Sequence, residues 1–363
     1  MARPTRVLIN QQALRDNYAI AQGASAAHCM PMVKANAYGH GAEIVCNALN
    51  LAPAFGVASI EEALELRSFG IDKPILLLEG TFSVDEISVA ADNQLWLMVE
   101  NNQQLKHLLQ ASLLQPVRVW LGLDTGMHRL GFQADEVNAA YCALAASDNV
   151  HNHMVLASHF ASADHLDDPK TYQQMALYDS VYADIAVADG AILQQSLANS
   201  AAILGWPGAQ RDWQRPGYML YGNSPFVDQY KDHRLQPVMT FTSAVTSLRS
   251  IAAGESVGYA GTWTAARTSR IATLTVGYAD GYPRHAPNGT PVLINGRRCP
   301  LVGRVSMDMI SVDVSDISEV NIGDPSILWG QNLSVNEIAA HCATNGYQLL
   351  SGISARVPRV AEN

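Results

Sequence analysis

Residues 55–78, FGVASIEEALELRSFGIDKPILLL, contain the pattern that decides the fold. An apolar run, Phe55–Ala58, precedes a stretch from Ile60 to Phe69 whose apolar residues recur at helical spacing, and a second apolar run, Ile75–Leu78, follows. Short apolar runs are typical of strands buried on both faces, and an amphipathic helix between two of them is typical of a parallel pair. The segment therefore predicts a strand–helix–strand unit.

The same alternation extends from about Met30 to Tyr221. Eight apolar runs are strand candidates: Met30–Val33, Phe55–Ala58, Ile75–Leu78, Leu95–Val99, Val117–Leu121, Met154–Ala157, Leu193–Leu197 and Tyr218–Tyr221. Such units predict a parallel sheet, and the pattern alone does not separate a doubly wound sheet from a barrel. Eight units within about 200 residues favour a (β/α)8 barrel of the TIM type.

The character of the sequence changes after Gly222. The polar, irregular segment 223–234 is where we place the domain boundary, which gives a barrel over residues 1–232 and a second domain over 233–363. Later apolar runs separated by glycine turns predict that this second domain is mainly β. These runs are Met239–Ile251, Ile271–Val276, Pro291–Ile294 and Met309–Val314. Val7–Asn10 is a further strand candidate, and pairing with the second domain is one of its open placements. The expected fold class is α/β.

Composition narrows the functional classes. Hydrophobic residues make up 48% of the 363 residues and charged residues 15%, which is typical of a folded chain with a large core. The net charge of −10 argues against a nucleic-acid partner. No signal-peptide core and no membrane-length apolar stretch is present, and the five cysteines have no metal-ligand spacing. We expect a cytoplasmic protein with free, buried thiols and without a metal or a membrane partner.

Polar residues at the carboxyl ends of the barrel strands are the candidates for chemistry, because loops at that end form the active sites of barrels. Lys34 follows the first strand. Burial of an ammonium group is costly, so such a lysine readily loses its proton, and a neutral amine can form a Schiff base. A lysine whose amino group extends to solvent is the alternative.

Later strand ends carry further candidates. Arg129 lies in a glycine-flanked loop after the fifth strand, His159 follows the sixth, and Ser200 follows the seventh. Arg215-Pro-Gly217 precedes the eighth. A hydroxyl among small residues and a glycine turn suit a phosphate site at the later strands. Taken singly, His159 could be a hydrogen-bonded core residue and Asn199-Ser200 a helix N-cap. Packing does not readily explain so many polar residues at one barrel mouth.

These segments resemble the alanine racemases over essentially the whole chain. The shared motifs are VKANAYGHG (33–41), LDTGMHRLG (123–131), SHFASAD (158–164), ANS (198–200), RPG (215–217), LYG (220–222), SVGYAGTW (256–263), GYADGYPR (277–284) and GRVSMDM (303–309). The resemblance implies a barrel with a C-terminal β domain, pyridoxal phosphate as the cofactor, and interconversion of L-alanine and D-alanine. It also implies a head-to-tail homodimer with shared active sites.

The resemblance also assigns roles to residues. Lys34 would hold the cofactor as an aldimine and act as a base on one face of the substrate, and Tyr259 of the partner subunit would act on the other. Arg129 and the backbone N–H of Met307 would bind the substrate carboxylate, with Asp308 beside Met307. The other cofactor-binding positions are Tyr38, His159 beneath the ring, Asn199, Ser200, Arg215 opposite the ring nitrogen, Gly217, Tyr218 and Tyr347. Tyr278, Arg284 and Arg304 would line the substrate entry channel.

One position departs from the family pattern. Seven residues before Arg129 the family commonly has a lysine whose carbamate neutralises and orients the arginine, whereas this chain has Gly122. Another anion or a neighbouring carboxylate must then hold Arg129. We predict a bound chloride or a water cluster beside Gly122, and an Asp or Glu side chain in that space would contradict this prediction.

Three other functions fit parts of the sequence. A basic amino-acid decarboxylase would have an acidic residue in place of Arg215, and a barrel protein of pyridoxal-phosphate homeostasis would lack the second domain. A racemase for larger amino acids is the strongest rival, because Gly122 leaves room beside Arg129. The sequence leaves open whether the enzyme supplies D-alanine for cell-wall synthesis or degrades one enantiomer.

Overall fold

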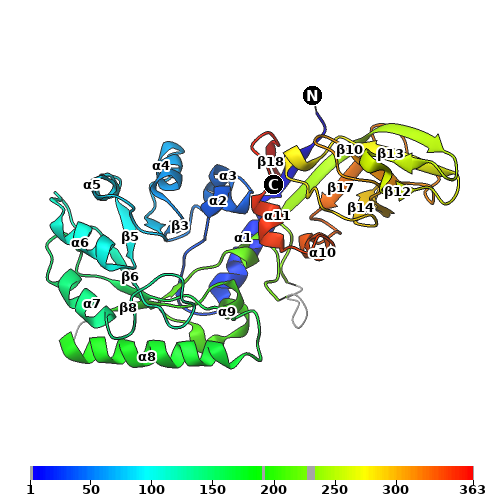
Figure 1. The fold of residues 1–363 in the computed structure, drawn as a ribbon. Coiled ribbons are helices and arrows are strands. Elements are labelled where there is room, and N and C mark those ends of the chain that lie inside the picture. Colours follow the sequence, from blue (N-terminus) through cyan, green and yellow to red (C-terminus); the bar gives the residue numbers. More distant parts are fainter. Residues whose placement is uncertain (1–2, 190–192, 227–233, 363) are drawn as a thin grey trace.

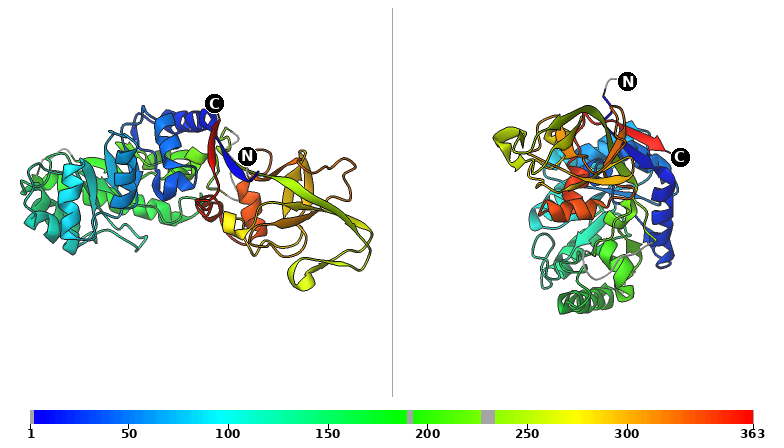
Figure 2. Two further views of the ribbon diagram at one scale, coloured as in Figure 1. Left: turned by 90° about the horizontal axis from the view of Figure 1, so that it is seen from above. Right: turned by 90° about the vertical axis from the view of Figure 1, so that its right-hand side faces the viewer.

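The computed structural model describes residues 3–189, 193–226 and 234–362. The chain forms two lobes, a barrel surrounded by helices and a β-rich lobe beside it (Figure 1). The helices α10 (Val335–His341) and α11 (Gly346–Ser351) lie where the two lobes meet, and α11 contacts α2 of the barrel. The view from above shows the same elongated arrangement, and the other view looks along it from the side of the β-rich lobe (Figure 2).

The barrel consists of eight parallel strands in the order β2-β9-β8-β7-β6-β5-β4-β3. Pairing of Met32 with Gly56 joins the first of these segments to β3 and closes the ring. The strands are β2 (His28–Cys29), β3 (Phe55–Val57), β4 (Ile75–Leu77), β5 (Leu95–Val99), β6 (Val119–Gly122), β7 (Val155–Ala157), β8 (Gln194–Ser196) and β9 (Trp213–Gln214). The expected barrel with a β domain is thus confirmed.

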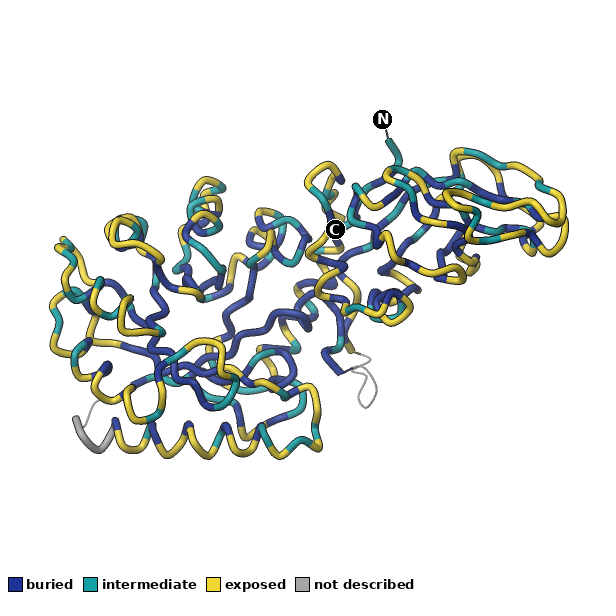
Figure 3. The backbone as a smooth tube through the Cα atoms, in the orientation of Figure 1, coloured by how far each residue is buried: buried dark blue, intermediate teal, exposed yellow. Residues whose placement is uncertain are grey.

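Helices surround these strands. They are α1 (Gln11–Gly23), α2 (Lys34–Tyr38), α3 (Ala42–Ala48), α4 (Ile60–Ser68), α5 (Val84–Asp92), α6 (Asn102–Gln110), α7 (Val137–Ala145), α8 (Pro169–Asp189), α9 (Ser200–Gly205) and the short 3₁₀ turns η1 (Pro207–Ala209) and η2 (Tyr218–Tyr221). The strands are buried, and the exposed residues lie mainly on the helices and loops (Figure 3). This distribution explains why the strands appear in the sequence as continuous apolar runs.

The prediction of an eighth strand at Tyr218–Tyr221 is wrong. That run forms η2, and Trp213–Gln214 is the eighth strand. All four residues of η2 are buried, and the Tyr221 hydroxyl donates to the Met32 carbonyl at 2.8 Å. A short apolar run indicates that a segment is buried, but it does not distinguish a strand from a buried turn. Arg215-Pro-Gly217 therefore follows the last strand, which places it at the barrel mouth with the other strand ends.

Large side chains fill the barrel interior. Met30, Leu76, Trp120 and Trp213 belong to one buried cluster, separate from the larger core that lies under the helices. The Trp120 and Trp213 rings meet edge to face with centroids 5.6 Å apart, and the Arg118 guanidinium lies 4.4 Å from the Trp96 ring centroid. The interior is therefore packed at the end where the strands begin, which leaves the open mouth at their carboxyl ends.

The second lobe is built around one long strand, β10 (Met239–Ile251). β10 pairs antiparallel with β1 (Arg6–Asn10), and β1 pairs in parallel with β18 (Arg359–Glu362). The other elements are β11 (Ser256–Val257), η3 (Tyr259–Gly261), β12 (Trp263–Thr264), β13 (Ser269–Leu274), η4 (Tyr278–Asp280), β14 (Pro291–Ile294), β15 (Arg297–Pro300), β16 (Ile310–Asp313) and β17 (Pro325–Trp329). The expected boundary at residues 232 and 233 lies at the edge of a segment, 227–233, that is outside the described residues.

Two further expectations concern the burial of the cysteines and the presence of a membrane-spanning helix. Cys29, Cys46, Cys299 and Cys342 are free and buried, whereas Cys142 is exposed, unlike the buried thiol expected there. Within the described ranges, no helix combines the length and the apolar composition needed to cross a membrane.

Glycine at the junction of the lobes provides a test of the packing. Gly222 ends η2 with φ of +82°, and a Cβ there would lie 1.8 Å from the Gln236 carbonyl oxygen. We expect Gly222→Ala to lower the free energy of unfolding by about 3 kcal/mol or more, because strain and a backbone clash add. Gly254→Ala is the matched control, since Gly254 has φ of +90° but no atom within 4 Å. Its cost should be about 1 kcal/mol, from strain alone. Equal urea-unfolding midpoints for the two variants would contradict the packing described here.

Candidate active site

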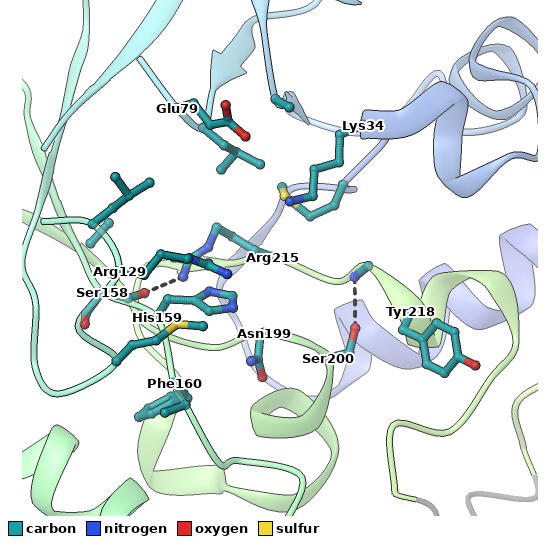
Figure 4. Close-up of a pocket in the computed structure, with 18 of the residues that line it drawn as sticks. Lys34, Glu79, Arg129, Ser158, His159, Phe160, Asn199, Ser200, Arg215 and Tyr218 are labelled. Carbon is teal, nitrogen blue, oxygen red and sulfur yellow. Dashed lines mark hydrogen bonds between the residues drawn. The ribbon is translucent and has the colours of Figure 1, made fainter. Parts of the chain in front are cut away.

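A cavity of about 790 Å³ opens at the carboxyl ends of the barrel strands. All the cofactor-binding residues expected from the sequence line it, together with Arg129: Lys34, Tyr38, Arg129, His159, Asn199, Ser200, Arg215, Gly217, Tyr218 and Tyr347. Tyr347 comes from α11, so the second lobe supplies part of the wall. Figure 4 shows the Lys34 side chain pointing into this cavity toward Arg215 and His159.

Lys34 begins an unusual backbone turn. The four residues after it, Ala35 to Tyr38, all have positive φ values of 52° to 54°. Left-handed backbone costs about 1–2 kcal/mol for each residue that has a Cβ, so such a turn persists only where its surroundings hold it. The Asn36 side chain accepts a hydrogen bond from the Ala42 N–H at 2.7 Å, and the Gly39 N–H donates to the Ala35 carbonyl at 2.9 Å.

Glu62 on α4 fastens this turn to the barrel. One carboxylate oxygen accepts from the Ala35 N–H at 2.6 Å and the other from the Ala58 N–H at 2.7 Å. Ala58 follows β3, so Glu62 connects the residue after Lys34 to the neighbouring strand end. Hydrogen bonds to a charged acceptor are stronger than those between neutral groups. The carboxylate therefore fixes the point from which the lysine side chain extends.

The surroundings of Lys34 favour the neutral amine. Burial, followed by the charge of Arg129, lowers the pKa of Lys34, and Arg215 contributes in the same direction. Glu79 and Glu62 oppose this shift without cancelling it. A lysine with a lowered pKa can act as a nucleophile or a base near neutral pH.

Arg215 is a buried, hydrogen-bonded cation in the cavity wall. It is 5% exposed, and its guanidinium donates to the Ser196 hydroxyl and to the Ser158 and Leu197 carbonyls, the last at 3.3 Å. Burial lowers the pKa of Arg215 to about 10, so the group keeps its charge at neutral pH. Burial and the charges of Arg215, Arg129 and Lys34 lower the pKa of His159 to about 3, so that imidazole is neutral.

Ser200 presents its hydroxyl proton to the cavity. Its oxygen accepts hydrogen bonds from the Gly217 N–H at 2.9 Å and the Met219 N–H at 3.3 Å. Because both lone pairs are engaged, the proton remains available as a donor. Asn199 forms the N-cap of α9 by accepting from the Ala202 N–H, as the alternative interpretation of this pair expected.

Gly217 and two tyrosines complete this end of the cavity. A Cβ on Gly217 would lie 2.7 Å from the Tyr38 hydroxyl, so only glycine leaves that phenol in place. The Tyr218 and Tyr347 rings stack with centroids 3.8 Å apart, and the Tyr218 hydroxyl donates to Asn336 of α10.

The residues present fit pyridoxal phosphate. A hydroxyl with a free proton, the Tyr38 phenol and the close backbone at Gly217 suit a phosphate at one end of the cavity, and a lysine with a lowered pKa suits an aldehyde. Ser200 and Tyr38 would hold the phosphate, and Lys34 would bind the aldehyde carbon. His159 would lie against the ring, with Arg215 as the donor to the ring nitrogen.

The side chain beside Gly122 contradicts the prediction of a chloride or a water cluster at that place. A Cβ on Gly122 would lie 2.9 Å from Cγ and 3.3 Å from Oε1 of Glu100. The side chain of Glu100, the residue after β5, therefore fills the space where we predicted a chloride or a water cluster. The sequence shows correctly that position 122 has no side chain to hold Arg129. The side chain that fills this space is Glu100, which follows the neighbouring strand β5.

The six residues of the second lobe to which the resemblance gives a role, apart from Tyr347, lie outside the cavity. Tyr259, Tyr278, Arg284, Arg304, Met307 and Asp308 all belong to the second lobe, and none of them lines the cavity. They lie on loops that contact one another: the Tyr278 N–H donates to the Ser306 carbonyl at 3.0 Å, and Gly303 packs against Val257. Tyr259 is 70% exposed. The structure thus gathers these residues in a second group, apart from Lys34.

Three carboxylates near the site were missed by the sequence interpretation. Glu62, Glu79 and Glu100 line the cavity with the predicted residues. Glu79 and Glu100 come shortly after β4 and β5, so inspection of those strand ends would have found them. Glu62 lies in the first turn of α4, where an acidic residue is ordinary, so no sequence signal distinguishes it.

Known proteins show similarity over both lobes. A family model described as the N-terminal domain of alanine racemase matches residues 9–225, and one for the C-terminal domain matches residues 238–361. An alanine racemase of Pseudomonas taetrolens is 48% identical over 359 residues, 98% of each chain. A catabolic alanine racemase of Pseudomonas putida is 47% identical, again over 98% of each chain. The crystal structure of the biosynthetic alanine racemase from Pseudomonas aeruginosa has a TM-score of 0.93 and 46% identity, covering 99% of this chain and 100% of that one.

The Glu62 contact generates a prediction. Glu62→Gln keeps one acceptor oxygen but turns an NH₂ group toward a backbone N–H, so one hydrogen bond is lost. We expect the free energy of unfolding to fall by about 1–3 kcal/mol. Pyridoxal phosphate should also dissociate more readily, because the turn that carries Lys34 loses its anchor. Glu61→Gln, at the neighbouring exposed position, is the control. Unchanged urea unfolding and cofactor retention in Glu62→Gln would show that the turn holds without this carboxylate.

Proposed function

Because this chain belongs to the alanine racemase family of pyridoxal-phosphate-dependent isomerases, we propose that it interconverts L-alanine and D-alanine with two bases, Lys34 and Tyr259 of the partner subunit. Similarity over both lobes supports the reaction. The observation that carries the mechanism is the position of Lys34, a buried amine with a lowered pKa inside a cavity that also contains two arginines.

Proton exchange at the substrate Cα is the central step. Pyridoxal phosphate, when bound, supplies an electron sink that makes the Cα–H of an amino acid acidic. Inversion is simplest with one base on each face, since a single group would have to move around the substrate. Lys34 takes or returns the proton at its Nζ atom on one face, and burial and the neighbouring arginines lower the pKa of that nitrogen, which favours its action as a base.

Arg215 restricts which reactions follow. Its guanidinium stays charged at neutral pH and has donors only, so with the cofactor bound it would donate a hydrogen bond to the ring nitrogen and could not protonate it. An acidic residue at this place would stabilise a protonated ring and a long-lived carbanion. Arg215 therefore favours rapid return of the proton to Cα, which is racemisation, and disfavours transamination.

Tyr259 serves the opposite face from a partner subunit. In its own chain it lies outside the Lys34 cavity and is 70% exposed. On the same lobe Met307 and Met309 are also exposed, at 53% and 50%, and they follow Arg304, whose backbone lies close to Gly258. Exposed apolar side chains grouped in this way are typical of a surface that another protein covers. We place that surface against the cavity mouth of a second copy, with Met307, Asp308, Tyr278, Arg284 and Arg304 near the substrate entrance.

A preference for small amino acids follows from the contents of the cavity. Room beside Gly122 was the reason to consider a racemase for larger substrates, and the Glu100 side chain occupies that room. The two relatives named as catabolic and biosynthetic are almost equally similar to this chain, so their names do not favour either role in the cell.

Subunit mixing tests the shared site. Lys34→Ala and Tyr259→Phe chains should each be almost inactive alone, and heterodimers formed from the two should contain one site with both bases. Activity in the mixture should therefore recover to about a quarter of that of the wild-type enzyme, since half the dimers are mixed and each has one intact site of two. Racemisation of alanine followed by circular dichroism is the measurement, and refolded mixtures of each variant with itself are the controls. Recovery that fails although mixed dimers form would contradict the assignment of Tyr259 to the partner.

A further inference from the structure

Glu100 is a carboxylate in the cavity wall that the proposed mechanism does not use. It directly follows β5, and its backbone N–H donates to the Gln104 side chain at 2.9 Å, which fixes the start of the side chain. One of its carboxylate oxygens, Oε2, is buried and has no hydrogen-bond partner among residues 3–189, 193–226 and 234–362. A buried carboxylate oxygen without a partner is costly, so this arrangement needs an explanation.

Gly122 on the adjacent strand leaves the space for this side chain. Its φ does not lie in the left-handed region, so the backbone conformation alone does not require glycine there. The 2.9 Å approach of a Cβ to Glu100 Cγ means that any larger residue would displace the carboxylate. Glycine at position 122 therefore matters because it allows Glu100 to lie against β6.

Charges from several strand ends face Glu100. Arg129, on the loop after β6, lowers the pKa of its carboxyl, as does Arg215 after β9, whereas Glu79 after β4 raises it. Burial is the largest influence and raises the pKa of Glu100 to about 7. Arg215 already donates hydrogen bonds to three protein acceptors. Arg129, by contrast, makes no hydrogen bond or ion pair with any residue that the structure describes.

We propose that Glu100 is a positioning residue whose carboxylate attracts and orients the Arg129 guanidinium, so that this guanidinium meets the carboxylate of the amino-acid substrate. The proposal rests on the proposed function for the identity of the substrate. Glu100 acts across the cavity wall, through charge, and touches neither substrate nor cofactor. Glu79 is the weaker candidate, because it is exposed and can be hydrated.

Removal of the carboxylate should weaken substrate binding more than turnover. In Glu100→Ala we expect KM for alanine to rise about tenfold, the usual size of one charge-assisted interaction, with kcat changed less than about threefold. Sodium formate should reverse most of the KM change, because the small anion fits the space that the side chain leaves. Glu65→Ala, at an exposed position on α4, is the control and should match the wild type with and without formate.

Glu100→Gln removes the charge of the side chain but keeps its shape. It therefore tests the effect of charge even if Glu100→Ala has a folding defect. The amide fills the same space without the charge, so KM should rise as in Glu100→Ala but formate should have no effect. A wild-type KM in Glu100→Gln would overturn the proposal. So would a Glu79→Ala variant that shows the formate-dependent behaviour in place of Glu100→Ala.

Bromide in crystals gives a measurement independent of activity. Crystals of the cofactor-loaded Glu100→Ala protein grown in sodium bromide should show anomalous density between Gly122 and Arg129, and wild-type crystals should not. Bromide beside Gly122 in the wild type, or none there in the variant, would overturn the proposal. A wild-type enzyme that does not racemise alanine would refute the proposed function alone, because the bromide result still decides the role of Glu100.

Discussion

The protonation of Lys34 depends on a balance between burial, which disfavours the ammonium form, and the charges around the amine. Burial and two arginines shift Lys34 toward its neutral form, and Glu62 and Glu79 act against them. The carboxylates cannot simply be removed, because Glu62 holds the backbone turn from which Lys34 extends. The backbone turn after Lys34 is stabilised by the Glu62 carboxylate, but the same negative charge raises the pKa of Lys34, which the arginines lower. The rigid barrel rim sets the distances at which these charges act.

Much of this arrangement could be predicted from the sequence, because its signals are local. Continuous apolar runs indicated the parallel strands, and Lys34, His159 and Ser200 were found at strand ends as barrel geometry requires. The error at Tyr218–Tyr221 arose because a buried 3₁₀ turn and a buried strand have the same apolarity. Pairing partners, which depend on the whole sheet, were needed to identify Trp213–Gln214 as a strand.

The parts of the site that could not be predicted depend on contacts between distant segments. Glu100 and Gly122 are separated by a helix and a strand in the sequence, yet one fills the space that the other leaves. Nothing near Gly122 in the sequence indicates this, and the expectation of a free anion there was wrong for that reason. Likewise, the left-handed turn after Lys34 depends on Glu62, a residue on another helix. Sequence patterns predicted which elements form, while complementary shapes and charges between elements had to come from the structure.

The pairing of β1 with β18 constrains how the chain folds. Leu8 lies beside Val360 in the sheet, so the chain must be synthesised through the barrel and the second lobe as far as β18 before this pair can form. Until then β1 has an unpaired edge that can associate with other chains. The barrel strands can pair in the order in which they are synthesised, since neighbours in the sheet are mostly neighbours in the sequence. The second lobe, which carries Tyr259, is completed only after the barrel sequence has been synthesised.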